Sequence, residues 1–307
     1  MPDANRPWGE LPTESRHPAS QNLDTLEPEE VVRLLVEEDA RGIKTVLRHA
    51  AELGQAAEWL ADALETGDHI LLAGAGTSGR LAVLEAAECP PTFGTEPERI
   101  EAVIAGGPDA VSAAREGAED REDDGRAAAD GLRRGDLLIG ISASSVTPYV
   151  RGALAAARAR GARTVLLTCT AASPELASLV DLLVALDTGP EILTGSTRLK
   201  AGSATKAALN AITTAAMVRA GKVFENLMVD LRPGSAKLRD RAVRITAAAG
   251  NVTPEQAADL LRSADGEVKT AIVMARLGVP AETARHRLSV AGGSVRQALA
   301  NRSTPGA

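Results

Sequence analysis

The sequence predicts an α/β fold with a five-stranded parallel sheet that helices cover on both faces. Five short apolar runs alternate with longer segments of helical spacing. The runs are His69–Ala73, Ile100–Ala105, Asp136–Ile141, Thr164–Thr168 and Asp181–Leu186. Each run is almost continuously apolar, which is typical of a strand buried on both faces. Aromatic residues make up only 2% of a chain that is 44% hydrophobic, so we expect a core of Ala, Leu and Val.

Helical spacing fills the segments between and after these runs. The segments are Arg80–Glu88, Asp109–Arg134, Pro148–Arg160 and Leu199–Ala220, with a shorter one at Pro174–Leu179. The first of them is predicted to stop at Pro90 and Pro91, because proline inside a helix removes a backbone hydrogen bond.

The two ends of the chain read as helical attachments. Residues 1–22 are rich in proline and polar side chains and are predicted to be irregular. Helical spacing then covers Leu23–Asp39, with Thr25 as a candidate cap, and Gly42–Glu65, which stops at Gly67. After a linker at 232–235, short helices are predicted at Ala236–Gly250, Thr253–Ala264, Glu267–Leu277 and Ala281–Leu299.

Charge and composition exclude several classes of protein. The net charge is −7, from 34 basic and 41 acidic residues, which argues against a general nucleic-acid surface. Cys89 and Cys169 lie far apart and indicate neither a disulfide framework nor a zinc site. The N-terminus has no apolar signal-peptide core, and the apolar segment at Ala207–Val218 is too short to span a bilayer. We therefore expect a cytoplasmic protein without a membrane or nucleic-acid partner.

A glycine-rich turn with two hydroxyls follows the first predicted strand. Gly74, Gly76 and Gly79 surround Thr77 and Ser78, and the turn opens a helix. A helix start of this kind favours an anion, because free N–H groups and the positive end of the helix dipole point the same way. The same glycines satisfy the dinucleotide pattern GxGxxG, but a dinucleotide turn rarely needs both hydroxyls, and no acidic residue ends the second strand. A plain tight turn is the third interpretation.

Two more hydroxyl clusters precede predicted helices. One contains Ser142, Ser144, Ser145 and Thr147, and the other contains Ser196 and Thr197 and leads into a helix with Lys200. Serine-rich turns often only cap helices. The carboxyl ends of parallel strands meet at one edge of the sheet, where ligands bind. Hydroxyl turns gathered at that edge predict a phosphate cradle.

Two carboxylates are candidates for acid–base chemistry. Glu88 lies at the end of a predicted helix beside two prolines, where the helix dipole disfavours an ionised carboxylate and so favours a general acid. A solvated glutamate at a helix end is the alternative. The stretch Glu116–Asp120 begins an acidic run through Asp124, and composition alone does not distinguish Glu119 from its neighbours.

Six stretches of this chain resemble N-acetylmuramic acid 6-phosphate etherases. They are Gly74–Arg80, Glu88–Gly94, Glu116–Asp120, Thr147–Val150, Thr194–Gly202 and Gly221–Asp230. The resemblance extends from Thr13 to about Leu299 and implies a sugar-isomerase (SIS) fold, which binds phosphosugars on a flavodoxin-like sheet. We therefore expect an N-terminal extension over residues 1–59, an SIS domain over 60–223 and a helical C-terminal domain over 224–307.

The resemblance also implies a reaction and its residues. Such enzymes remove D-lactate from the 3-position ether of a phosphorylated amino sugar, without a metal or cofactor and usually as homodimers. By the family's motifs, Glu88 and Glu119 are the implied acid–base pair. The expected substrate-binding residues are Thr77, Ser78, Ser142, Ser144, Ser145, Thr147, Ser196, Thr197 and Lys200.

The chain departs from the family pattern in the expected ligand loop. Ser145 stands where the family has glycine, and Val146 stands where it has arginine; His17 also replaces an asparagine. Three other functions stay open. A phosphosugar sensor needs neither glutamate, a sugar isomerase needs no acid for a lactyl ether, and a dinucleotide enzyme would require a nicotinamide.

Overall fold

The computed structural model describes residue 9 and residues 11–231 and 234–300. Its contacts divide the chain into two compact units, which are described separately below. The first contains Met1–Ala86 and Glu98–Thr213, and the second contains Ala87–Pro97 and Thr214–Ala307. The domain boundaries expected at residues 59 and 223 stay a prediction, and residues 232 and 233 of the predicted linker lie outside the described residues.

A five-stranded parallel sheet forms the centre of the first unit. Its strands are β1 (Ile70–Gly74), β2 (Ile100–Ile104), β3 (Leu137–Ser142), β4 (Arg163–Thr168) and β5 (Leu182–Ala185). The strand order is β2-β1-β3-β4-β5, which is the flavodoxin-like order. Each strand agrees with a predicted run to within one residue at either end, so the predicted fold class is confirmed.

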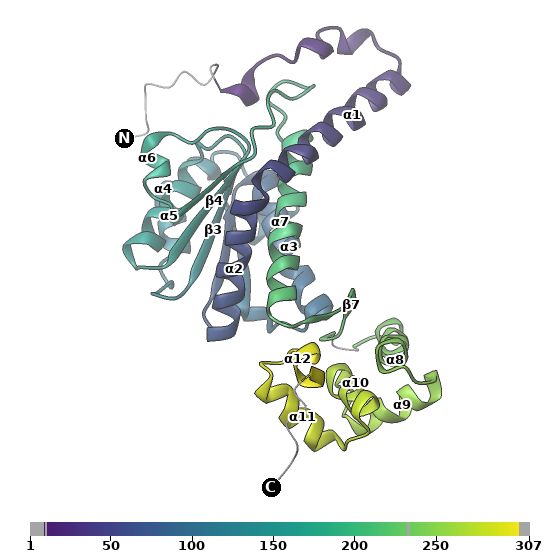
Figure 1. The fold of residues 1–307 in the computed structure, drawn as a ribbon. Coiled ribbons are helices and arrows are strands. Elements are labelled where there is room, and N and C mark those ends of the chain that lie inside the picture. The colour runs from purple at the N-terminus through teal and green to yellow at the C-terminus, as the bar shows by residue number, and fades with distance from the viewer. Residues whose placement is uncertain (1–8, 10, 232–233, 301–307) are drawn as a thin grey trace. The chain divides into compact units, whose positions relative to one another are not determined.

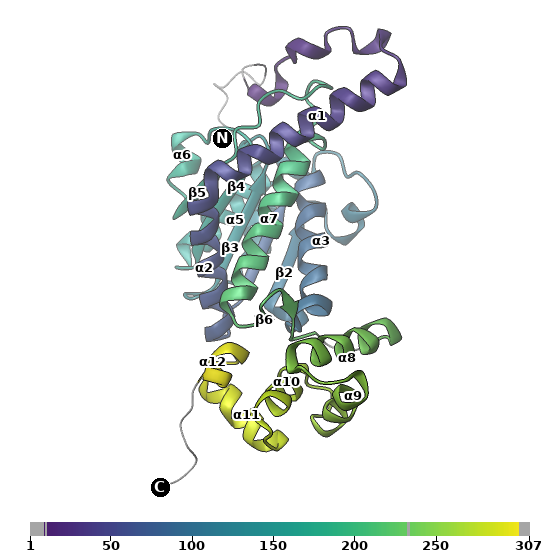
Figure 2. The ribbon, with the colours of Figure 1, turned by 45° about the vertical axis from the view of Figure 1, so that its right-hand side comes forward.

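Helices cover both faces of this sheet (Figures 1 and 2). One face carries α4 (Glu122–Ala128), α5 (Pro148–Ala159) and α6 (Pro174–Ala177), and the other carries α2 (Ala50–Thr66), α3 (Gly76–Phe93) and α7 (Lys200–Arg219). Helices α4 and α5 can pack closely because Gly125 has no side chain. A Cβ atom at this position would overlap the carbonyl of Tyr149. The close approach explains how a core with few aromatic residues is filled.

Two helix predictions between β1 and β3 were wrong. Helix α3 does not stop at Pro90 and Pro91 but continues to Phe93, where Gly94 adopts a φ of 64° and donates to the Pro90 carbonyl at 2.9 Å. The single helix predicted over Asp109–Arg134 is replaced by the short turns η7 (Pro108–Val111) and η8 (Ala118–Asp120) and by α4. Gly117 interrupts the helical path with a φ of 71°.

The N-terminal part consists of short 3-10 turns followed by a long helix. The turns are η2 (Pro12–Glu14), η3 (Pro18–Ser20) and η4 (Leu23–Thr25), and α1 (Pro28–Val46) follows, joined to α2 by η5 (Leu47–His49). The predicted cap at Thr25 was wrong, because its hydroxyl donates to the Asn22 carbonyl. Glu27 caps α1 instead, through a capping box with Glu30.

A buried ion pair fastens α1 to the start of α7. Glu38 on α1 is 3% exposed, and its carboxylate accepts a hydrogen bond from Lys200 Nζ at 2.9 Å. His17 Nε2 lies 3.2 Å from the same oxygen, and Arg41 pairs with the other oxygen. Burial by itself raises the pKa of Glu38, but the hydrogen bond and charge of Lys200, with the charges of His17 and Arg41, leave it below its ordinary value.

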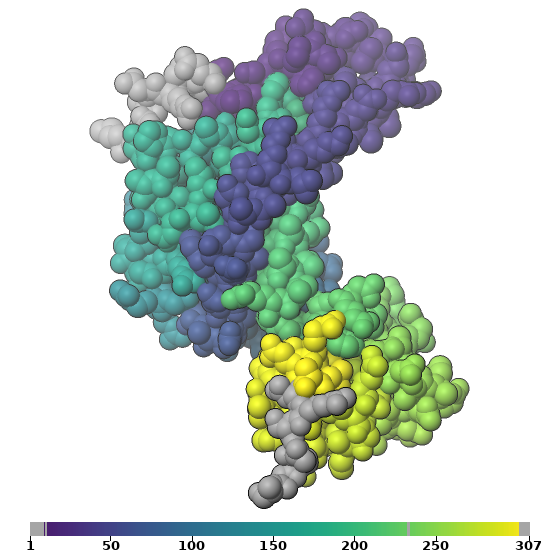
Figure 3. Space-filling model, in the orientation of Figure 1, coloured from purple at the N-terminus to yellow at the C-terminus, as the bar shows by residue number. Residues whose placement is uncertain are grey.

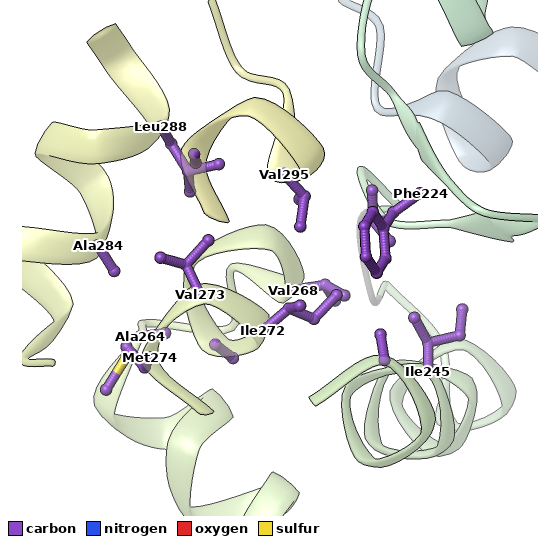
Figure 4. Packing of buried hydrophobic residues seen from close by; sticks show 14 of the residues in the cluster. Phe224, Ile245, Ala264, Val268, Ile272, Val273, Met274, Ala284, Leu288 and Val295 are labelled. Atoms are coloured by element: carbon purple, nitrogen blue, oxygen red, sulfur yellow. The ribbon is translucent and has the colours of Figure 1, made fainter. Parts of the chain in front are cut away.

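The second unit has its own hydrophobic core. Its helices are α8 (Ala236–Gly250), α9 (Pro254–Ser263), α10 (Val268–Leu277), α11 (Ala281–Val290) and α12 (Val295–Ala300), and a hairpin of β6 (Val223–Phe224) and β7 (Leu227–Met228) precedes them. Phe224 of the hairpin points into the cluster formed by Ile245, Ile272 and Val295 (Figure 4). The last predicted helix is two helices, because Gly292 and Gly293 both have positive φ.

The hairpin of the second unit is also joined to α10 by charge. Asp230 Oδ2 accepts hydrogen bonds from Lys222 Nζ at 2.8 Å and from Lys269 Nζ at 3.0 Å. The stretch Gly221–Asp230 singled out in the sequence is thus a structural element of this unit. Among the described residues of the whole chain, no helix is both long and apolar enough to cross a membrane.

We predict that Glu38→Gln lowers the free energy of unfolding by about 3–5 kcal/mol, because it leaves the buried Lys200 ammonium without a countercharge. The exposed Glu65 on α2 provides the control, and Glu65→Gln is expected to change stability by less than about 0.5 kcal/mol. Urea unfolding at neutral pH measures both values. Equal effects of the two substitutions would contradict a stabilising role of the ion pair.

Because of the same ion pair, we expect the free energy of unfolding to depend on pH. Since the folded protein lowers the pKa of Glu38, the stabilisation is complete above the ordinary value of 4.5 and is lost as the pH falls through the lower folded value. Wild-type stability should therefore fall more steeply in acid than that of Glu38→Gln. Parallel stability curves of the two proteins below that pH would contradict this assignment.

Candidate functional site

The carboxyl edge of the sheet contains a switch point between β1 and β3. These strands are neighbours in the sheet, yet the chain runs from β1 outward to β2 on one side and from β3 to β4 on the other. Open α/β sheets bind ligands in the crevice at such a point. The first hydroxyl turn follows β1 and the second follows β3, so the structure brings these two predicted turns to the same edge of the sheet.

Close packing fixes the first turn against the sheet. A Cβ atom at Gly79 would lie 2.5 Å from Ile104 Cγ1 and 2.8 Å from the Gly74 carbonyl oxygen, so only glycine fits at Gly79. Thr77 and Ser78 stand in the first turn of α3 and are half-buried. Neither hydroxyl has a hydrogen-bond partner among the described residues, and both are available to a ligand.

The second turn contains both bonded and free hydroxyls. Ser142 Oγ and Thr147 Oγ1 share a hydrogen bond of 2.8 Å that closes the turn. Ser145 is buried and donates its hydroxyl to the Ala171 carbonyl at 2.9 Å. Ser144 is half-buried, and its hydroxyl makes no hydrogen bond within the described part of the chain. Ser144 is therefore the hydroxyl that this turn leaves for a ligand.

Ser145 occupies a backbone position that favours glycine. Its φ is 58°, in the left-handed region, which costs a residue with a Cβ atom about 1–2 kcal/mol. The departure from the family's glycine therefore carries a backbone cost, which the hydrogen bond to Ala171 offsets in part. The side chain expected to contact substrate acts here as an internal anchor of the loop.

The third turn adjoins the first across Gly202 of α7. A Cβ atom built there would lie 3.5 Å from the Thr197 carbonyl oxygen and 3.6 Å from Thr77 Cγ2. Ser196 and Thr197 are half-buried, and their hydroxyls have no hydrogen-bond partner in the described ranges. All three predicted turns thus belong to one region at the carboxyl edge of the sheet.

The amino end of α7 is not free to bind an anion. Glu191, which is 1% exposed, accepts hydrogen bonds from the Ala201 N–H at 2.8 Å and from the Lys200 N–H at 3.1 Å. Burial raises the pKa of Glu191 above its ordinary value, although these two bonds act in the opposite direction. Sequence reasoning missed Glu191, because nothing in the spacing shows that a carboxylate nine residues before the helix folds back onto its first turn.

Two of the cations that follow hydroxyl turns already donate hydrogen bonds to other residues of the chain. The Lys200 ammonium donates to Glu38 and, at 2.6 Å, to the Pro190 carbonyl, so its position differs from the substrate contact expected of it. Arg80 donates to the carbonyls of Val111 at 2.9 Å and Ala113 at 3.3 Å. Arg80 thereby holds the segment that leads to Glu119.

Both candidate carboxylates are exposed. Glu119 lies in η8, and Glu88 lies near the end of α3. Neither makes a hydrogen bond or an ion pair with any described residue. Glu88 follows Ser78 by ten residues of the same helix, which corresponds to an advance of about 15 Å at 1.5 Å per residue.

Neither a reactive thiol nor a metal cluster adds to the site among the described residues. Burial raises the pKa of the Cys169 thiol to about 11, which keeps it neutral. No cluster of three or more His, Cys, Asp or Glu side chains in the described ranges is arranged to hold a metal ion. The chemistry that the three turns offer is hydrogen bonding to an anion. Glu119 in the first unit and Glu88 in the second are separate, unpaired carboxylates.

Known proteins resemble parts of this chain or nearly all of it. A family model described as the glucokinase regulatory protein N-terminal SIS domain matches residues 52–158. The phosphoheptose isomerase GmhA from Neisseria gonorrhoeae aligns in structure with 61% of this chain and 100% of its own, at a TM-score of 0.45 and 22% identity.

Two sequence relatives match over almost the full length. An N-acetylmuramic acid 6-phosphate etherase from Rubrobacter xylanophilus is 49% identical over 95% of this chain and 96% of its own. One from Parasynechococcus marenigrum is 46% identical over 96% of this chain and 93% of its own. The chain belongs to the N-acetylmuramic acid 6-phosphate etherase family.

Proposed function

We propose that this protein cleaves the lactyl ether of N-acetylmuramic acid 6-phosphate with water, giving N-acetylglucosamine 6-phosphate and D-lactate. The observation that carries the proposal is the group of five free, half-buried hydroxyls at the carboxyl edge of the sheet. They occur in a chain that is 49% identical to a relative named for this reaction. Such a reaction belongs to the breakdown of cell-wall amino sugars, and we propose that it takes place in the cytoplasm.

The free hydroxyls are proposed to bind the 6-phosphate. Thr77 and Ser78 follow β1, Ser144 follows β3, and the turn with Ser196 and Thr197 adjoins Thr77 at Gly202. Hydroxyl donors form strong hydrogen bonds with a charged phosphate oxygen. The amino end of α3, an 18-residue helix, adds the positive end of its dipole. Ser142, Ser145 and Thr147 hold the shape of the second turn through the hydrogen bonds described above.

Glu88 and Glu119 are the proposed acid and base. When the sugar ring opens, the C1 aldehyde acidifies the proton on C2, and one carboxylate removes it. The other, in its protonated form, donates a proton to the ether oxygen as the C3–O bond breaks and D-lactate leaves. Water then adds to the C2–C3 double bond and restores the hydroxyl at C3. The two roles need one ionised and one protonated carboxyl group in the same site.

We further propose a homodimer in which the two copies share their sites. The advance of about 15 Å along α3 from Ser78 to Glu88 is much longer than a hexose phosphate. Glu88 would then act on a substrate whose phosphate is held by the other copy.

One alternative has an observation in its favour. The match of residues 52–158 to the SIS domain of a regulatory protein favours a phosphosugar-binding regulator that has no catalytic activity. Such a protein would keep the hydroxyl cradle and need neither Glu88 nor Glu119. Release of D-lactate from N-acetylmuramic acid 6-phosphate by the purified protein distinguishes the two functions, since a regulator would bind the sugar without turnover.

We predict that Glu88→Gln and Glu119→Gln each lower kcat by about 10²–10⁴-fold, the usual contribution of a positioned acid or base. Melting temperatures should stay near that of the wild type, since both side chains are exposed and unpaired. The control is Glu116→Gln, which changes an exposed neighbour of Glu119 and should leave kcat within about twofold. Wild-type turnover in either variant would remove that residue from the mechanism.

Deuterium incorporation tests whether the C2–H bond of the sugar breaks during the reaction. In heavy water, deuterium is expected at C2 of the N-acetylglucosamine 6-phosphate product, because that carbon loses its proton and regains one from solvent. Mass spectrometry or proton NMR detects the label. A product without deuterium at C2 would rule out the elimination route while leaving the reaction itself in place.

We predict that Ser78→Ala and Ser144→Ala each weaken binding of the 6-phosphate sugar by roughly 1.5–3 kcal/mol, because each removes a hydrogen bond to a charged group. Titration calorimetry with phosphorylated and unphosphorylated N-acetylmuramic acid measures the effect. The control Ser112→Ala removes an exposed hydroxyl that bonds to the Asp109 carbonyl and should leave affinity unchanged. Equal affinity of the wild type for the two sugars would contradict the proposal that these hydroxyls bind the 6-phosphate.

A further inference from the structure

Helix α1 carries an apolar stripe that no described part of the chain covers. Ten large hydrophobic side chains are exposed in the described residues, and four of them lie on α1 and η5. They are Val32, Val36, Ile43 and Leu47, with exposed fractions of 59%, 63%, 47% and 78%. Single exposed hydrophobics are ordinary, but several on one helix mark an interaction surface.

The stripe follows one face of the helix. Its members are spaced by four, seven and four residues, and the exposed Ala40 fills the gap between Val36 and Ile43. Spacings of three and four residues place all five side chains on the same side. The opposite side of α1 contains its buried residues, including Glu38 and Gly42, and packs on α7. The stripe is therefore the outward face of a helix whose inward face is already used.

The pictures agree with this assignment. In two views the N-terminal half of α1 extends beyond the layers of the sheet (Figures 1 and 2). In the space-filling view the indigo band of α1 lies at the surface, and no other described segment covers it on that face (Figure 3). About 22 Å of helix separates Val32 from Leu47 at 1.5 Å per residue, which is long enough for a helix-to-helix contact.

The stripe is symmetric along its length. Val32 and Leu47 lie equally far from the midpoint between Asp39 and Ala40, and so do Val36 and Ile43. Two copies of α1 that run antiparallel across a two-fold axis at this midpoint would match Val32 with the partner's Leu47 and Val36 with the partner's Ile43. Self-complementarity of this kind is what a two-fold contact between identical chains requires.

Charges along α1 have the same self-complementarity. Apart from Arg33, which pairs with Glu29, the exposed charges of the N-terminal half are the acids Glu29, Glu30 and Glu37. The C-terminal end of α1 and the adjoining η5 carry the exposed cations Arg41, Lys44 and Arg48. The helix dipole alone accounts for this order of signs but not for the stripe beside it. In an antiparallel pair the acidic half of each helix faces the basic end of the other, whereas a parallel pair would oppose like charges.

We propose that α1 is the contact between two copies of this chain, which pair antiparallel through the stripe Val32, Val36, Ala40, Ile43 and Leu47. The inference gives the proposed homodimer its contact surface and rests on that part of the proposed function. It does not depend on the reaction. Neither Glu88 nor Glu119 lies on α1, so the contact and the chemistry are tested by different substitutions.

Sedimentation velocity over a range of concentrations tests the stripe. The wild type should have twice the 31.7 kDa mass of one chain. The double variant Val36→Glu and Ile43→Glu should dissociate at least tenfold more readily, because it places carboxylates in the apolar contact. Val290→Glu is the matched control, since Val290 is 68% exposed on α11, outside α1, and its substitution should leave the mass unchanged.

A charge exchange tests the antiparallel direction. Glu37→Lys alone and Lys44→Glu alone should each weaken the dimer about threefold to tenfold, because each opposes like charges across the axis. The two changes together should restore wild-type dissociation. Ala40→Cys, which lies nearest the axis, should also give a covalent dimer with a short bismaleimide, whereas the wild-type cysteines are buried and should give none.

Three results would overturn the proposal. They are a wild-type chain that stays monomeric at tens of micromolar, a dimer that the stripe variant leaves intact, and an Ala40→Cys protein that the reagent does not join. D-lactate release from the same wild-type sample separates this outcome from the proposed function. A dimer that depends on the stripe but releases no lactate would contradict the proposed reaction and support the proposed contact through α1.

Discussion

The buried ion pair between Lys200 and Glu38 is the interaction on which the candidate site depends. It joins the first residue of α7 to the middle of α1, and His17 adds the N-terminal segment to the same carboxylate. Ala19 donates its backbone N–H to His17 Nδ1, which orients the ring with Nε2 toward Glu38. Such a pair contributes little net stability compared with an apolar core, but it permits few alternative arrangements. It therefore fixes where α7 begins, and with it the third hydroxyl turn.

The site separates hydroxyls that shape it from hydroxyls that are free. Serine and threonine cap, close turns and bind ligands with the same group, and only their partners in the fold reveal which role each has. In the second turn, Ser142 and Thr147 bond to each other, Ser145 bonds to Ala171, and Ser144 alone is left. A site built in this way keeps its free donors in place before any ligand arrives, which lowers the entropy that binding costs.

Much of the fold could be predicted because its strongest signals are local. The strands were located to within a residue because each is a continuous apolar run, and the hydroxyl turns follow from their place after strands. The wrong predictions arose where one residue or one distant contact decides the structure. Gly117 interrupts the helix predicted over Asp109–Arg134, and Gly94 sets the end of α3. The bonds of Glu191 and Glu38 are made with residues far along the chain or across a loop, and no periodicity encodes them.

The carboxylate that caps α7 makes two helix starts at this edge of the sheet unequal. Glu191 accepts hydrogen bonds from the N–H groups of Lys200 and Ala201, so these backbone donors of α7 are already used. The start of α3 keeps its N–H groups and the free hydroxyls of Thr77 and Ser78. The positive end of a helix dipole attracts an anion most where its N–H groups are unpaired. Of these two helix starts, only that of α3 is therefore open to an anion, and the chain itself supplies the anion for the other.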